Sequence, residues 1–263
     1  MHTLSHRLIL RRLVVLGTPF VLAILDIFHP SFFAQTGVFQ AISSQINWWI
    51  TLHVLQLPLF CLLALSLYLL LKGVQNVAAT ISRISIAIFV IFYPAFDGLI
   101  GIGTGTLIRY AASLPAAQRV FLGNVIDAFW QSPIAYLLAA LGSVGWAIAV
   151  LAAAIALSCP TWSRWPVIAL AVFAGIVNAS AQVLGMFSPV WLAAVVVTSI
   201  AFGVVARPHL AVGLLLMASF LFSVTHAPPF GPLGLACYFL AALQLELQRE
   251  SVSLPTARQE AHS

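Results

Sequence analysis

The chain has 263 residues, of which 62% are hydrophobic and 6% are charged, and its formal net charge is +5. Soluble domains carry about 25% charged residues, so this chain cannot cover a water-facing surface. The positive charge does not indicate nucleic-acid binding, because the eleven lysine and arginine residues are scattered between apolar segments and form no basic tract. The composition therefore predicts a multi-pass integral membrane protein whose first partner is the lipid bilayer.

Apolar stretches long enough to cross a bilayer, about 20 residues each, recur along the chain and are separated by breaks that contain proline or glycine. Proline disfavours helix in the preceding residue and has no N–H, so these breaks mark helix ends. The pattern predicts an all-α transmembrane bundle of about eight spans, at 9–28, 47–71, 84–108, 134–157, 166–185, 189–206, 209–225 and 232–248. Because the sixth and seventh stretches are short and are joined only by Arg207-Pro208, seven spans are the alternative.

The placement of positive charge predicts the orientation. Cytoplasmic segments of membrane proteins are enriched in lysine and arginine. With eight spans, only Arg109 and Arg119 fall on the side opposite the N-terminus. We therefore expect both termini in the cytoplasm, in what we expect to be a bacterial plasma membrane. Residues 1–248 would form one membrane domain, and residues 249–263 a polar, disordered cytoplasmic tail.

The connection from Tyr110 to Ser132 is one of the two substantial ones on the predicted outer side. Its second half, 120–131, has helical character and carries Asn124, Asp127 and Gln131 at i, i+3 and i+7, which is one face of a helix. This segment is either a short helix that lies on or dips into the outer surface, or an extension of the fourth span.

Ionisable residues inside the apolar stretches gather in the predicted outer half. A charged group in a bilayer is costly and usually marks function. From the rise of a helix, Asp97 lies roughly 16 Å deep, near the middle of the hydrocarbon core, and the others lie closer to the outer face. The sequence predicts a polar site centred on Asp97 and His53. The candidate residues are Asp97, His53, Gln56, Asp26, His29, Asp127, Asn178, Gln182 and His226.

Helical spacing places several of these side chains on shared faces. His53 and Gln56 share a face with Trp49, while Asp97 shares one with Tyr93. The glycines that follow Asp97 lie inside an apolar span, so they indicate close helix packing, with local unwinding beside Asp97 as an option, and not a phosphate loop. Whether the polar faces meet does not follow from spacing.

Three functions are compatible with this pattern. The first is a small-molecule or ion binder or transporter, in which Asp97 exchanges a proton or binds a cation and His53 tunes it. The second is a membrane-embedded enzyme, with or without a metal, that acts on a lipid or isoprenoid. The third is an accessory subunit in which the polar groups only hold helices together. No cofactor is assigned; a metal ion, if present, would be held by His53, Asp97 and His226.

Overall fold

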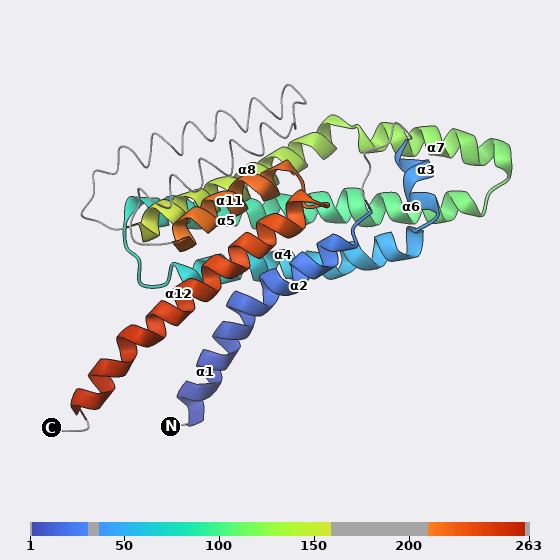
Figure 1. Ribbon diagram of the computed structural model, residues 1–263. Coiled ribbons are helices and arrows are strands. Elements are labelled where there is room, and N and C mark those ends of the chain that lie inside the picture. The colour runs from blue at the N-terminus through green and yellow to red at the C-terminus, as the bar shows by residue number, and fades with distance from the viewer. Residues whose placement is uncertain (1, 31–36, 159–209, 261–263) are drawn as a thin grey trace.

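The computed structural model describes residues 2–30, 37–158 and 210–260, and the regular elements in these ranges are all helices (Figure 1). Five of the helices are long and apolar enough to cross a membrane: His6–Ile27, Ile46–Leu70, Val77–Ala112, Pro133–Leu157 and Phe230–Arg249. A sixth, Leu210–Val224, is apolar but shorter. The predicted all-α membrane protein is confirmed. The expected spans at 166–185 and 189–206 lie outside the described residues, so the count of eight and the orientation stay predictions.

Two of the spanning helices contain a wider, π-helical turn. The first span comprises α1 (His2–Arg12), the π turn η1 (Leu13–Gly17) and α2 (Thr18–Ile27). The third comprises α5 (Val77–Phe96), the π turn η2 (Asp97–Gly103) and α6 (Thr104–Ala112). The other spanning helices are α4 (Ile46–Leu70), α8 (Pro133–Leu157) and α12 (Phe230–Glu260), and α11 (Leu210–Val224) packs between the last two.

The centre of the bundle is filled with aromatic rings. Phe60 of α4, Phe89 of α5, Trp146 of α8 and Phe222 of α11 are all buried, and their rings contact one another. Small residues let the backbones approach: a Cβ on Gly142 of α8 would lie 2.8 Å from the Cα atom of Tyr93. Glycine at such a contact is what tight helix packing in membranes requires.

A lobe of shorter helices projects beyond one end of the bundle. The helix Val77–Ala112 has 36 residues, or about 54 Å at the usual rise, which exceeds the ~30 Å hydrocarbon core. Its last part, α6, packs with α3 (Val38–Ser43) and α7 (Ala116–Trp130) around a small apolar core. α7 lies beside α6 and is separated from α8 by a break at 131–132 (Figure 1). The 110–132 connection therefore runs in the direction of the long axis of the bundle, beyond one end of it, and does not lie flat across that end.

The opposite end of the bundle carries both the start of α1 and the end of α12 (Figure 1). There Arg11 of α1 makes a two-pronged ion pair with the buried carboxylate of Glu246 in α12. Arg249 also contacts Glu246, and it donates to the carbonyl oxygen of Leu70 at 2.5 Å. The backbone of α12 continues as helix to Glu260, through most of the segment for which the sequence predicted a disordered tail.

Candidate functional site

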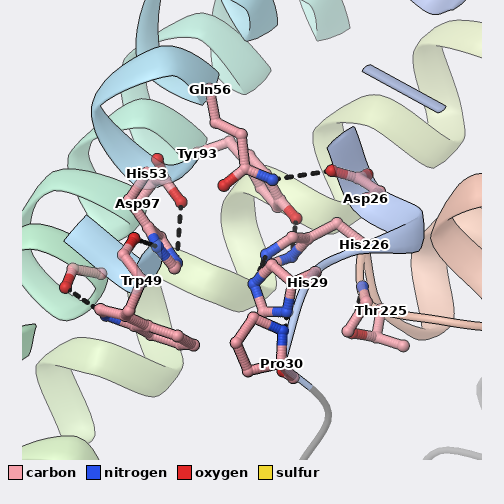
Figure 2. A network of polar contacts seen from close by, with 12 residues as sticks. Asp26, His29, Pro30, Trp49, His53, Gln56, Tyr93, Asp97, Thr225 and His226 are labelled. Carbon is pink, nitrogen blue, oxygen red and sulfur yellow. Dashed lines mark hydrogen bonds and ion pairs between the residues drawn. The ribbon is translucent and has the colours of Figure 1, made fainter. Parts of the chain in front are cut away.

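Three histidines from distant parts of the sequence converge (Figure 2). His29 follows α2, His53 lies in α4, and His226 lies in the connection between α11 and α12. Their possible ligand nitrogen atoms all lie within 4.8 Å of one another. His29 and His53 are buried, and their rings stand edge to face at a centroid separation of 5.3 Å.

Hydrogen bonds to the backbone determine which ring nitrogen of two of the histidines carries hydrogen. The Nδ1 atom of His29 lies 2.8 Å from the carbonyl oxygen of Pro30, and that of His53 lies 2.8 Å from the carbonyl oxygen of Trp49. A carbonyl oxygen can only accept, so both Nδ1 atoms donate. In a neutral imidazole the Nε2 atom then keeps its lone pair. Metal-binding histidines show this pattern: the nitrogen that points away from the ion donates a hydrogen bond, and the other nitrogen binds the ion.

The third ring, His226, is held by a tyrosine hydroxyl. The Nδ1 atom of His226 lies 2.8 Å from the Oη atom of Tyr93, and its Nε2 atom lies 3.1 Å from the Nε2 atom of His29. A phenol can donate or accept, so Tyr93 can pair with either tautomer of His226. Tyr93 is almost fully buried. The sequence placed it on the Asp97 face, but did not single it out as a candidate.

The two histidines outside the spanning helices are uncharged at neutral pH. Burial lowers the pKa of His29 to about 4, and its bond to the Pro30 carbonyl opposes this only in part. Burial also lowers the pKa of His226 well below its ordinary value, and the charges of His29 and His53 lower it further. Neutral imidazole is the form that binds metal ions.

Asp97 completes the group from the first turn of η2. One of its carboxylate oxygens, Oδ1, lies 3.7 Å from the Nε2 atom of His53, and the side chain is 1% exposed. Neither carboxylate oxygen has a hydrogen-bond partner. A lone pair on nitrogen and a carboxylate repel each other unless a proton or a cation lies between them. The pair is therefore suited to hold positive charge.

The π turn places Asp97 beside α4 because its glycines leave room. Pro94 removes a backbone hydrogen bond just before the turn, and wide turns of this kind are frequent at functional sites. A Cβ on Gly101 would lie 2.0 Å from the Cδ2 atom of His53. The Nε1 atom of Trp49 donates to the Gly101 carbonyl oxygen at 2.6 Å. The close packing expected of these glycines is confirmed for Gly101 and Gly105, whereas Gly98 and Gly103 have no close neighbour of this kind.

A cavity of about 200 Å³ lies among these side chains. Its walls include the three histidines, Asp97, Tyr93 and the rings of Trp49 and Trp130. A single water needs about 10–15 Å³ of such space, so the cavity has room for an ion with further small ligands. Polar groups on one side and aromatic rings on the other give it the usual character of a ligand site.

A second polar pair lies next to the histidines, outside the walls of the cavity. The Nε2 atom of Gln56 donates to the Oδ1 atom of Asp26 at 2.7 Å, and both side chains are fully buried (Figure 2). The remaining oxygen of each side chain has no hydrogen-bond partner. This hydrogen bond joins α2 to α4 next to the histidine group.

The structure thus brings together some of the candidates and not others. His29, His53, His226 and Asp97 meet at the cavity, with Asp26 and Gln56 adjacent. Asp127 lies in the lobe, where its Oδ1 atom accepts from the backbone N–H of Phe39 at the start of α3. Asn178 and Gln182 lie outside the described residues.

No protein-family model, curated protein or solved structure matches the chain. Its function has to be inferred from the geometry of the site.

Proposed function

We propose that the protein binds a divalent transition-metal ion, for which Zn²⁺ is the best fit, through the Nε2 atoms of His29, His53 and His226. The observation that carries this proposal is the convergence of three histidine rings, two of which have their Nδ1 hydrogens directed to backbone carbonyls. Three nitrogen ligands with a fourth position left open are the pattern of a catalytic zinc site. Imidazole also suits copper and nickel, so zinc is the first ion to test.

The distances allow such an ion after a small adjustment. Zn–N bonds are about 2.0–2.1 Å long, which puts two ligands of one tetrahedral ion roughly 3.3 Å apart. The Nε2 atoms of His29 and His226 are 3.1 Å apart, and the whole set lies within 4.8 Å. Binding would draw the ligand nitrogens together by up to about 1.5 Å, a motion that side-chain rotation can supply.

Asp97 supports the ion by its charge. A divalent ion with three neutral ligands keeps two positive charges, which are costly inside a bilayer. The unpaired carboxylate beside His53 offsets one of them. The fourth coordination position then faces the cavity, where water or an oxygen atom of a ligand can occupy it.

The packing on the far side of the site favours a resident ion over one in transit. Phe60, Phe89, Trp146 and Phe222 fill the bundle between the histidines and the end that carries the termini. These rings are at most 3% exposed. An ion crossing the described part of the bundle by this route would have to displace them, so we favour ion binding over ion transport.

Metal content of the purified protein tests the proposal. We expect about one zinc ion per chain after loading and removal of excess, and loss of this zinc in His53→Ala and His226→Ala. His6→Ala is the matched control, because His6 is an exposed residue of α1. Cobalt substitution gives a second measurement, since its visible spectrum reports the ligands even where yields are low. Retention of full stoichiometry in both histidine variants would exclude this site.

A further inference from the structure

An apolar groove lies between α2 and α12, the first and last of the spanning helices. Its volume is about 530 Å³. Phe20, Ile24 and Ile27 of α2 form one wall, and Leu233 and Leu240 of α12 belong to the other. Phe20 and Phe239 meet across it with ring centroids 5.6 Å apart. Every side chain that lines the groove is apolar.

The position of the groove identifies what fills it. α2 and α12 belong to two of the helices that are apolar and long enough to cross the bilayer. The groove walls face outward: Phe20 is 49% exposed and Leu233 is 50% exposed. On the outer face of a spanning helix the surrounding solvent is lipid hydrocarbon. The occupant that this groove fits is therefore an acyl chain.

One end of the groove lies next to residues that line the histidine cavity. Pro228 lines the groove, and Ala227, the residue before it, lines the cavity. On the other wall, Ile27 stands two residues before His29. Pro228, Pro229 and Pro232 form this end of the groove, and because proline has no N–H they present no unpaired donor to hydrocarbon.

We propose that the groove binds the acyl chain of a membrane lipid and places the oxygen-bearing end of that lipid at the open position of the metal ion. The inference rests on the proposed metal site and adds the class of its ligand: an acyl chain that ends in a carboxylate or in an ester or amide carbonyl. Both kinds of end supply the hard oxygen ligand that Zn²⁺ accepts in its fourth position.

Photocrosslinking in lipid nanodiscs tests the groove. The probes are a palmitate and a palmitoyl lysolipid that each carry a diazirine in the chain, and the expected adducts map to α2 and α12. Ala236→Trp places a ring in the groove and should lower labelling by roughly tenfold, because losing contact with even two methylenes costs about that factor. The control is Ala87→Trp, an exposed position of α5. Comparison of the two probes shows whether the free acid or the lipid is preferred.

Measuring bound metal distinguishes a failure of this inference from a failure of the proposed function. Ala236→Trp should keep its zinc, because Ala236 is not among the residues that line the cavity. In the cobalt-substituted protein, palmitate or the lysolipid should shift the visible spectrum, and hexadecane, which lacks oxygen, should not. Equal labelling of Ala236→Trp and Ala87→Trp, or no spectral shift with either oxygen-bearing probe, would overturn the inference while leaving the zinc site intact.

Discussion

Trp49 positions both Gly101 and His53, through its indole N–H and its backbone carbonyl. Its indole N–H donates to the carbonyl oxygen of Gly101, and its own backbone carbonyl accepts from the Nδ1 atom of His53. The indole ring also packs against the imidazole of His53, at a centroid separation of 4.0 Å. The orientation of His53 is thus set before any ion arrives, which reduces the ordering that binding requires.

Tyr93 should matter to metal affinity although it is not a ligand. Tyr93→Phe removes the hydroxyl that holds His226 and keeps the ring that packs in the core. Loss of such an outer partner typically costs about 10–100-fold in metal affinity, and we expect a weakening of that order in a chelator-competition titration. Tyr238→Phe is the control, because Tyr238 is a buried tyrosine that bonds to Ser66 instead. Equal affinities in the two variants would assign Tyr93 to packing alone.

At the level of the elements, the π turn η2 determines how closely α4 and the third span pack together. Gly101 lies against His53, and Gly105 lies against Trp49 and Ile50, one helical turn further on. An ordinary side chain at either position would push the helices apart. Asp97 begins the same turn, so the element that permits close packing also carries the carboxylate of the site.

Gly101→Ala should therefore damage the site, and Gly103→Ala should not. A Cβ on Gly101 would lie 2.0 Å from the His53 ring, whereas one on Gly103 would meet only the carbonyl oxygen of Gly98 at 3.7 Å. We expect Gly101→Ala to lose zinc and to melt at a lower temperature. Gly103→Ala should bind normally and be as stable or slightly more stable, since alanine is favoured over glycine in a helix by up to about 1 kcal/mol. Zinc stoichiometry and the melting temperature should be measured for both variants. The same change in Gly101→Ala and Gly103→Ala would contradict the packing argument.

At the scale of the molecule, the buried ionisable groups of the described residues gather towards the two ends of the bundle, and the core between them contains hydroxyl groups such as that of Ser66 but is mainly apolar. One end carries the cluster of Arg11, Glu246 and Arg249, which ties the first and last spanning helices to α4. The histidine group lies towards the lobe of α3, α6 and α7, because Trp49 and Trp130 belong to the apolar core of the lobe and also line the histidine cavity. The aromatic core separates the two. This polarity fits a site that faces one side of the membrane.

The predicted orientation can be tested at the two ends. Lys72 is exposed in the turn after α4, and Arg119 is exposed in α7 of the lobe. With the termini in the cytoplasm, an impermeant thiol reagent applied to intact cells should label Arg119→Cys and should label Lys72→Cys only after the cells are opened. The parent chain, whose native cysteines remain, provides the background. Labelling of both positions from the same side would refute the orientation.

Much of the membrane architecture could be read from the sequence because its physical cause is local. A run of apolar residues about 20 long has to cross the bilayer as a helix, whatever its neighbours are. Proline or glycine marks the start of α8 and follows the ends of α4 and α8, and both helices begin and end within one residue of their predicted bounds. The third span begins seven residues before its predicted start at 84, because the helix includes Arg83, whose side chain donates to the carbonyl oxygens of Leu71 and Val74.

The sequence by itself determined that ionisable groups lie in apolar helices, and the cost of burying charge made them candidates. Only the tertiary structure decided which of them meet. His29 and His226 are 197 residues apart and come within hydrogen-bonding distance because α2 and α12 pack side by side. Asp127, also an acidic candidate, lies instead in α7 of the lobe, where it accepts from the backbone N–H of Phe39 at the start of α3. Helical spacing shows which residues share one face of a helix. The rotation of each helix about its axis depends on how it packs against its neighbours, here through the close contacts at Gly101 and Gly142.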